Sequence, residues 1–288
     1  MKICVTGASG RLGRATVAEL LAHGHEVVAT DIAPAREDLG TDLLQADLTE
    51  YGQAVEVLDG TEAVVHLAAI PAPGLRTPAH TFTANTAMNS NVFLAAAQFR
   101  LPRVVWASSE TTLGLPFDVP PRYAPVDEDH FPVATTTYAL SKVVGETMAT
   151  HIADYSGIPF VGLRFSNIFI PEEYVRMPSF WPDARMRRWN LWGYIDVRDA
   201  AAACRLALDA PVEGSVNLII AAADTVMNRP SADLLGEEFP GVRLTRDVDG
   251  FGTLLAIDRA REIIGYEPRH SWRDHVRDDA NDHVAGDS

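Results

Sequence analysis

Two residues four positions apart, Tyr138 and Lys142, have the types and the spacing needed to move a proton. They lie in the segment TTTYALSKVVGE (135–146), and Lys142 is one of only two lysines in the chain. On a helix, residues four apart share one face. A phenol beside an ammonium can act as a general base when an alcohol is oxidised, because the positive charge favours the phenolate. An amphipathic helix with a surface lysine has the same spacing, so the pair alone does not decide between these interpretations.

A serine pair supplies a hydroxyl for the same chemistry. Ser108 and Ser109 end the apolar run RVVWASS (103–109). The carboxyl edge of a parallel sheet is where such folds bind ligands. We therefore expect Ser109 to lie beside the Tyr138 phenol and to hold the substrate oxygen.

The segment VTGASGRLG (5–13) predicts a dinucleotide site. Its glycines Gly7, Gly10 and Gly13 follow an apolar run and open a helical pattern. Glycines there allow a tight turn and let backbone N–H groups approach a pyrophosphate, although such a turn is weak evidence by itself. Asp31 ends the next apolar run, where a carboxylate would accept from a ribose 2′-hydroxyl and repel a 2′-phosphate. The expected cofactor is NAD, unless Asp31 only caps a turn.

The elements that position these residues alternate between strands and helices. Nearly continuous apolar runs are typical of strands covered on both faces, and strand–helix alternation predicts an α/β fold with a doubly wound parallel sheet of the Rossmann type. The expected strands are KICVTGA (2–8), EVVATDI (26–32), LLQADL (43–48), AVVHLAA (63–69), RVVWASS (103–109) and FVGLRFS (160–166). The expected helices between them are RLGRATVAELLAHG (11–24), YGQAVEVLDG (51–60), TFTANTAMNSNVFLAAAQFR (81–100) and TYALSKVVGETMATHIADYSG (137–157).

After residue 165 the regular alternation is lost. The segment 170–193 is rich in tryptophan and proline without clear periodicity, which is typical of irregular covering structure. We therefore predict a NAD-binding Rossmann domain over 1–165 that also receives 194–220. Residues 166–193 and 221–288 are predicted to form a small substrate-binding lid, with the C-terminal residues as a solvated tail.

Composition excludes several classes of partner and site. The formal net charge of −15 disfavours nucleic acid and anionic membranes, which bind surplus Lys and Arg. No apolar run approaches the roughly 20 residues that cross a bilayer, so we expect a cytoplasmic protein. Cys4 and Cys204 lie in apolar patterns without zinc spacing, which predicts buried side chains and no metal site.

Taken in order, TGASGRLG, ADL, HLAA, SSETTLG, YALSK and LRFSNIF resemble the extended short-chain dehydrogenase/reductases, the NAD-dependent epimerase/dehydratase group. The resemblance implies an NAD-dependent oxidoreductase that oxidises a hydroxyl of a sugar, sugar acid or similar small polar substrate. It implies Ser109, Tyr138 and Lys142 as the catalytic residues, with Tyr138 as general base, and a homodimer formed through the helices of 83–98 and 138–155. The implied cofactor contacts are Gly7, Ser9, Gly10, Arg11, Leu12, Gly13, Asp31, Asp47, Leu48, Leu67, Ala68, Ala69, Asn85, Tyr138, Lys142 and Ser166.

Asn85 has a second interpretation, as a structural hydrogen-bonding residue of its helix. The alternative activity within the family is that of a nucleotide-sugar epimerase or dehydratase that retains its NAD. Only 32 positions separate Arg164 from Asp196, which is short for a nucleotide clamp.

The segment PEEYVRMPSFW (171–181) is similar to a segment of the uronate dehydrogenases. That similarity implies that Arg176 binds a sugar carboxylate and that Ser166 contacts the substrate, unless Arg176 is a surface arginine paired with a neighbouring glutamate. The chain departs from that subfamily at Pro71, where its members have serine, and at Glu110 and Thr111, where they have Asn-His. The implied substrate contacts are Ser109, Glu110, Thr111, Ser166 and Arg176.

Overall fold

Seven parallel strands form the centre of the molecule. The computed structural model describes residues 1–130 and 132–276. The strands lie in the order β10-β7-β5-β4-β1-β2-β3, so the chain starts near the middle and winds outward in both directions. They are β1 (Lys2–Thr6), β2 (Glu26–Asp31), β3 (Leu43–Gln45), β4 (Ala63–His66), β5 (Arg103–Ser109), β7 (Phe160–Phe165) and β10 (Ser215–Ile220).

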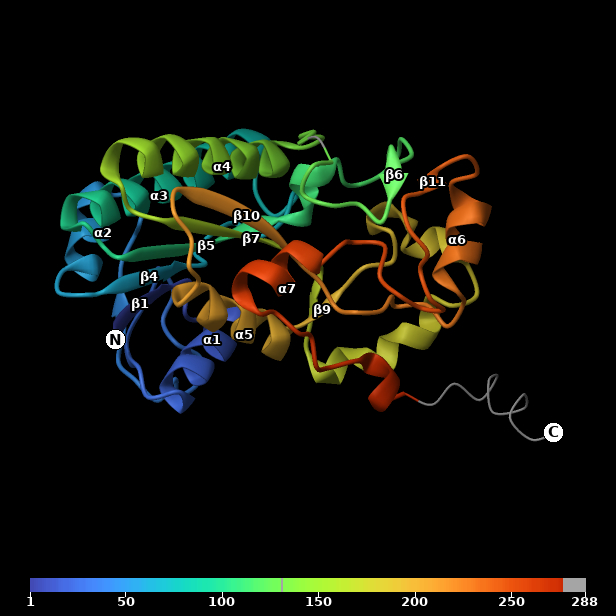
Figure 1. Cartoon of the computed structure of the whole chain (residues 1–288). Helices are drawn as coiled ribbons and strands as arrows, with labels where there is room; N and C mark the ends of the chain where they lie inside the picture. Colours follow the sequence, from blue (N-terminus) through green and yellow to red (C-terminus); the bar gives the residue numbers. More distant parts are fainter. Residues whose placement is uncertain (131, 277–288) are drawn as a thin grey trace.

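Helices cover both faces of this sheet (Figure 1). Helices α3 (Pro78–Phe99) and α4 (Thr137–Ser156) pack together on one face, with α2 (Tyr51–Leu58) against α3. Helices α1 (Arg11–Ala22) and α5 (Val197–Leu208) pack together on the other. Because both faces are covered, the strands are nearly continuous runs of buried apolar residues, as in the buried Ala63–His66.

The fold class is therefore confirmed, and each expected strand and helix of the first 165 residues is present. The main differences are that the third strand ends at Gln45 instead of Leu48 and the fourth at His66 instead of Ala69. Ala46 still donates its N–H to the Asp31 oxygen, and the chain then turns into α2. This early end leaves the backbone of 46–48 at the sheet edge rather than within it.

The helix that carries Tyr138 and Lys142 is fixed at both ends by local chemistry. The Thr136 hydroxyl accepts the Ala139 N–H at 3.0 Å, which satisfies a free donor in the first turn. At the other end Gly157 has a φ of 75°, a left-handed conformation that glycine adopts at little cost. The sequence thus sets where α4 begins relative to β5 and which residues face the sheet.

The rest of the chain forms short elements at the carboxyl end of the sheet (Figure 1). They include the short strand pairs β6–β11 and β8–β9, five 3-10 segments, and helices α6 and α7. Their bounds are β6 (Tyr123–Ala124), β8 (Ile168–Phe169), β9 (Ile195–Asp196), β11 (Arg243–Leu244), η1 (Glu110–Leu113), η2 (Pro171–Ser179), η3 (Ala184–Met186), η4 (Arg188–Asn190), α6 (Ser231–Glu238), α7 (Asp258–Ile264) and η5 (Trp272–Asp274).

One cluster of buried apolar side chains runs from the sheet into this region, from Ile3 to Trp272. The short elements therefore share a core with the sheet. The division into a cofactor-binding domain and a lid stays a prediction, and residues 277–288 of the predicted lid lie outside the described residues.

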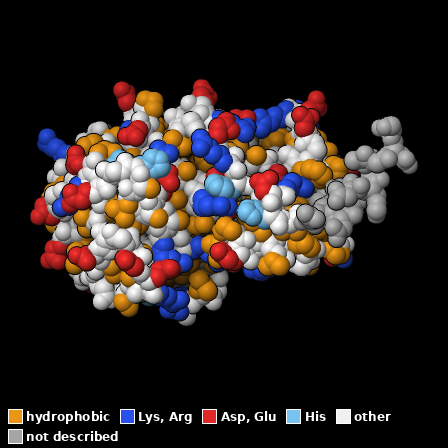
Figure 2. Space-filling model, turned by 90° about the horizontal axis from the view of Figure 1, so that it is seen from below, with side chains coloured by type: hydrophobic (Ala, Val, Ile, Leu, Met, Phe, Trp, Pro, Cys, Tyr) orange, Lys and Arg blue, Asp and Glu red, His pale blue; other side chains and the backbone are white. Residues whose placement is uncertain are grey.

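On the face shown in Figure 2, acidic and basic side chains are interspersed. Within residues 1–130 and 132–276 no helix is both long and apolar enough to span a bilayer. Cys4 and Cys204 are free and buried. The homodimer through α3 and α4 stays a prediction.

A buried ion pair ties α4 to the sheet. Arg164 of β7 donates from Nε and Nη2 to the two carboxylate oxygens of Glu146, both at 2.9 Å, and both side chains are almost fully buried. Ser108 of β5 adds a 2.6 Å hydrogen bond to the same carboxylate. A bidentate pair with a further donor fixes orientation as well as distance. The pair thus holds the helix of Tyr138 at a defined place on the sheet.

We expect Arg164→Ala to lower the free energy of unfolding by about 3 to 5 kcal/mol, because it leaves the Glu146 carboxylate buried without its cation. Chemical denaturation of the variant measures the loss. Arg185→Ala is the control, because Arg185 pairs with Asp183 on the surface, where such pairs contribute about 0 to 1 kcal/mol. Equal losses in the two variants would show that the buried pair has no special role.

Candidate functional site

The loop between β1 and α1 leaves no room for side chains at two of its glycines. A Cβ on Gly13 would lie 2.0 Å from the Gly7 oxygen, and a Cβ on Gly7 would lie 2.7 Å from the Ala68 nitrogen. Gly7 also has a φ of 68°. Both clashes are with backbone, which cannot move aside. The loop therefore needs glycine, and it sets the start of α1 against β4, where N–H groups can bind an anion.

A large cleft of about 1170 Å³ opens over this loop and runs along the carboxyl edge of the sheet. Asp31 lies in it at the end of β2 and accepts the N–H of Ser9 at 2.9 Å and that of Ala33 at 3.1 Å. A carboxylate has about four acceptor sites, so it can still accept a ribose hydroxyl. The glycine loop, Asp31 and the small side chains of Ala68 and Ala69 fit an extended dinucleotide.

Ser109, Tyr138 and Lys142 lie together farther along the same cleft. Ser109 ends β5, accepts the Thr111 N–H at 3.2 Å and is hydrogen-bonded to Tyr138. The Lys142 ammonium lies 5.7 Å from the centroid of the Tyr138 ring and donates to the Ala107 oxygen at 2.7 Å. Ser109 and Tyr138 therefore lie close to each other, as expected.

The electrostatics of this group differ from the expectation. Burial raises the pKa of Tyr138 to about 12, the Ser109 hydrogen bond lowers it, and the charge of Glu110 raises it further. Burial lowers the pKa of Lys142 to about 8, and Glu146 opposes that change. Sequence reasoning had the ammonium of Lys142 lowering the pKa of the phenol. In the structure the loss of hydration on burial is the main influence on the pKa of the phenol, and it acts in the opposite direction.

Glu110 is a buried carboxyl directly after Ser109. It accepts the Ser166 hydroxyl at 2.6 Å and the Asn190 side-chain N–H at 3.2 Å. Burial raises its pKa to about 7, while these hydrogen bonds and the positive charge of Arg187 lower it. Near neutral pH the carboxyl of Glu110 is therefore partly protonated and carries less than a full negative charge.

Most residues predicted for the site line this one cleft. They are Gly7, Ser9, Gly10, Arg11, Leu12, Gly13, Asp31, Asp47, Leu48, Leu67, Ala68, Ala69, Ser109, Glu110, Thr111, Tyr138, Lys142 and Ser166. The fold brings them together from the loops after β1, β2, β3, β4, β5 and β7 and from the first turns of α1 and α4.

Asn85 was expected to contact the cofactor, and this expectation is corrected because Asn85 does not line the cleft. Its side chain accepts the Ile70 N–H at 2.8 Å and donates to the Ile70 oxygen at 3.1 Å. It also donates to Ser141 at 3.4 Å. The residue thus fixes the loop after β4 from behind, which matches the structural interpretation and leaves no group for a cofactor.

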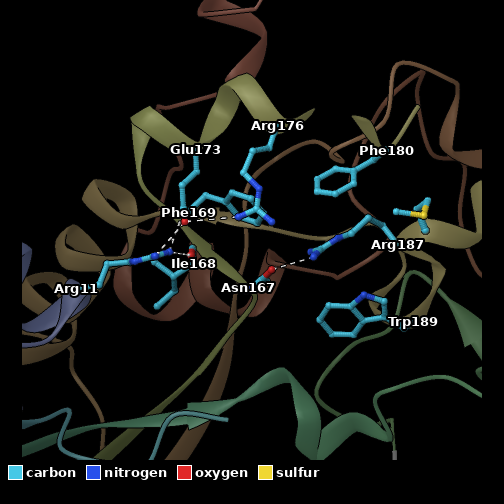
Figure 3. A pocket seen from close by; sticks show the side chains of 10 residues that line it. Arg11, Asn167, Ile168, Phe169, Glu173, Arg176, Phe180, Arg187 and Trp189 are labelled. Carbon is cyan, nitrogen blue, oxygen red and sulfur yellow. Dashed lines mark hydrogen bonds and ion pairs between the residues drawn. The ribbon is translucent and has the colours of Figure 1, made fainter. Parts of the chain in front are cut away.

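Arg176 is outside the main cleft as well. Its side chain is 61% exposed and lies 3.8 Å from Glu173. It lines a smaller pocket of about 240 Å³ that shares Arg11, Asn167, Ile168 and Trp189 with the cleft (Figure 3). Both interpretations of Arg176 thus remain, since it is near a glutamate and also beside a cavity.

Sequence reasoning missed the residue at the centre of that smaller pocket, Arg187. Its guanidinium stacks on Trp189, at 4.8 Å from the ring centroid, and on Phe169 and Phe180. It donates to Asn167 at 3.0 Å. The aperiodic segment RMRRWN (185–190) contains three arginines and no pattern that selects one of them.

The tryptophans of the covering region have different roles. Trp189 lines both cavities. Trp181 donates to the Val226 oxygen and stacks on Trp272, and Trp192 is fully buried. Of these three tryptophans of the covering segment, Trp189 alone lines the two cavities. Within the described residues no group of three or more His, Cys, Asp or Glu side chains is placed to hold a metal ion.

Comparison with known proteins agrees with this architecture. Residues 3–223 match the model of the "NAD dependent epimerase/dehydratase family". A UDP-glucose 4-epimerase of Lacticaseibacillus casei is 28% identical, over 96% of this chain and 94% of its own. An L-arabinose 1-dehydrogenase (NAD(P)(+)) of Haloferax volcanii is 30% identical, over 79% of this chain and 91% of its own. A solved structure of a mutated uronate dehydrogenase is 21% identical with a TM-score of 0.68, over 100% of this chain and 87% of its own.

The raised pKa of Glu110 predicts a pH-dependent stability difference. The folded protein holds the proton up to about pH 7, whereas an unfolded glutamate releases it near 4.5, so stability from this group is lost as pH rises between the two values. Glu110→Gln does not titrate. We therefore compare the Tm of Glu110→Gln with that of the unsubstituted protein at each pH. The difference should change in favour of the variant between pH 5 and pH 8, by the equivalent of about 3 kcal/mol in the free energy of unfolding.

Thermal unfolding at the two pH values measures this difference. Glu56→Gln, at an exposed position of α2, is the matched control and should give the same relative Tm at both. A Glu110→Gln difference that does not change with pH would contradict the assignment.

Proposed function

Because the chain belongs to the NAD-dependent epimerase/dehydratase family, we propose that it is an NAD-dependent oxidoreductase that oxidises a hydroxyl of a sugar, a sugar acid or a similar small polar molecule. The observation that carries the proposal is that Ser109, Tyr138 and Lys142 line the same cleft as the glycine loop. A full-length relative that is a sugar dehydrogenase supports net oxidation.

In this proposal the glycine loop and Asp31 hold NAD, which supplies a hydride acceptor with a positively charged ring when bound. Positive charge from bound NAD and from Lys142 would favour the phenolate of Tyr138, and in that form its Oη would accept the hydroxyl proton of the substrate and become a neutral phenol. Ser109 Oγ holds the substrate oxygen and, through its hydrogen bond, lowers the pKa of the phenol. Burial of Tyr138 excludes water from the proton transfer.

Lys142 lies close to the ring of Tyr138. Its ammonium is anchored on the Ala107 oxygen and is buried, so it is a fixed positive charge near the phenol. Its pKa of about 8 keeps it mostly protonated at neutral pH. We propose that it would orient the cofactor ribose and stabilise the phenolate form of Tyr138 before that phenolate accepts the substrate proton.

The second candidate is an epimerase or dehydratase that retains its NAD. The full-length UDP-glucose 4-epimerase relative favours it. Against it, the covering segment between β7 and β9 is short and packs five of its aromatic side chains into the shared core, which leaves little backbone to surround a nucleotide.

Turnover separates the two candidates. We expect the purified protein, given NAD and a panel of free aldoses, uronic acids and nucleotide sugars, to produce NADH in proportion to substrate consumed for at least one free sugar or sugar acid. Absorbance at the NADH band measures it. Conversion of a nucleotide sugar with no net NADH would favour the epimerase.

We expect Tyr138→Phe to reduce kcat by about 10²- to 10⁴-fold, because it removes the general base and little else. NAD affinity, measured by fluorescence titration, should stay within about threefold of the original. Tyr155→Phe, at an exposed position of the same helix, is the matched control and should leave kcat unchanged. A Tyr138→Phe variant with near-normal kcat would end the catalytic assignment.

A further inference from the structure

Two arginines are buried in the described part of the chain, and only one of them is paired with a carboxylate. Arg164 is bonded to Glu146 and serves the fold. Arg187 is 8% exposed and has no carboxylate within ion-pair distance among the described residues. Its hydrogen bonds are to Asn167 and to the Gly193 oxygen, both uncharged. A buried guanidinium without a carboxylate is costly to the fold, so its position calls for another explanation.

Arg187 still has N–H donors that make no hydrogen bond among the described residues. A guanidinium has five N–H donors, and the two hydrogen bonds leave others free. Nε is buried without a hydrogen-bond partner among the described residues. Burial lowers the pKa of Arg187 to about 10, so the side chain stays charged at neutral pH. Stacking on three aromatic rings offsets part of the lost hydration and holds the plane of the group fixed.

The pocket around Arg187 has a surplus of positive charge. Figure 3 shows Arg176 and Arg187 pointing toward each other across the cavity above Asn167. The charge of Arg176 lowers the pKa of Arg187, as expected of like charges that face one another. Glu173 is the one acidic residue of the lining, and it is bonded to Arg11 at 2.7 Å. In a chain with a net charge of −15, two facing guanidinium groups form a site for an anion.

The cavity is small and adjoins the reactive group. About 240 Å³ is less than the roughly 300–1,000 Å³ of pockets that take a whole drug-sized ligand, so it suits one end of a molecule that lies in the main cleft. Asn167, which lines both cavities, directly follows Ser166, and Ser166 is hydrogen-bonded to Glu110 beside Ser109. A short molecule can therefore have a hydroxyl at Tyr138 and its other end at Arg187.

We propose that this pocket binds the anionic end group, a carboxylate or a phosphate monoester, of a small hydroxylated substrate, and that Arg187 is its principal ligand and a determinant of specificity. The inference rests on the proposed function, since it names the class of substrate for the same cleft. Arg176, exposed and near Glu173, closes the outer side of the pocket. Glu110 interacts with Arg187 by charge from the inner side.

Binding to the NADH-loaded protein tests the pocket apart from turnover, because NADH cannot accept a hydride from an alcohol. The probes are D-glucuronate and D-galacturonate, the 6-phosphates of the parent hexoses, and D-glucose and D-galactose as neutral parents. Calorimetry gives the ratio of the neutral parent's Kd to that of the charged probe. We expect a ratio of at least ten for one carboxylate or one phosphate, and which of them has the larger ratio identifies the anion.

Arg187→Gln should lower that ratio to about one, while the affinity for the neutral parent and for NADH stays within about threefold. Arg187→Lys keeps the charge but not the planar fork, so it should keep part of the ratio, and it covers the case in which Arg187→Gln does not fold. Arg185→Gln, two positions away and exposed, is the matched control and should keep the whole ratio.

Any of three results with the sugar probes would overturn the proposal, and so would a fourth with NADH. No charged probe binds more tightly than its parent; or the ratio is unchanged in both Arg187 variants; or the variants lose affinity equally for charged and neutral probes, which is the behaviour of a purely structural arginine. A selective loss of NADH affinity would instead assign the pocket to the cofactor and would also reject it. Loss of turnover in Tyr138→Phe is independent of all three, so the two proposals can fail separately.

Discussion

The direction of the strands is the constraint on which the site depends. Because the main strands are all parallel, the loops that follow β1, β2, β4, β5 and β7 all leave at the same edge. Each loop brings a few polar groups to that edge, and the helices on the two faces prevent the sheet from moving under them. Residues 100 or more positions apart, such as Gly7 and Tyr138, thereby line one cleft without any direct bond between them. The exact placement then depends on two rigid contacts: the backbone packing at Gly7 and Gly13, and the buried Arg164–Glu146 pair.

Burial at this edge has opposite consequences for different groups. It disfavours the charged form of Tyr138 and of Glu110, so both tend to keep their protons, and it disfavours the protonated form of Lys142. The phenol therefore starts neutral in a dry environment, and any positive charge placed near it has a large effect because little water screens it. Glu110 works in the other direction, because its negative charge raises the pKa of Tyr138. Its own raised pKa limits this effect near neutral pH.

The parts of the molecule that a sequence can predict are those with a local physical signature. Strand and helix positions follow from apolar runs and periodicity, and the glycine loop follows from glycines that no other residue can replace. Asn85 has no such signature, because an asparagine on a helix can face a ligand or a loop, and only the position of Ile70 shows which. The two-residue strands β6, β8, β9 and β11 are too short for periodicity and form only because distant segments meet. The covering segment between β7 and β9 is the hardest part to predict, because tertiary contacts give its three arginines within four positions different surroundings.

Those three arginines have the same side chain but different surroundings, and their roles differ accordingly. Arg185 is exposed and forms a local pair with Asp183, which water largely screens. Arg188 reaches Glu238 of α6 and joins two covering segments. Arg187 is buried against aromatic rings and its hydrogen-bond partners are uncharged, so its charge is screened least, and Glu110 acts on it only from beyond ion-pair distance. Stability alone would favour an apolar side chain at such a position, because a well-packed hydrophobe costs nothing to bury. A buried charge that weakens the fold is best explained by a ligand that needs it, and the facing Arg176, which is also positive, favours an anion in the space between the two guanidinium groups.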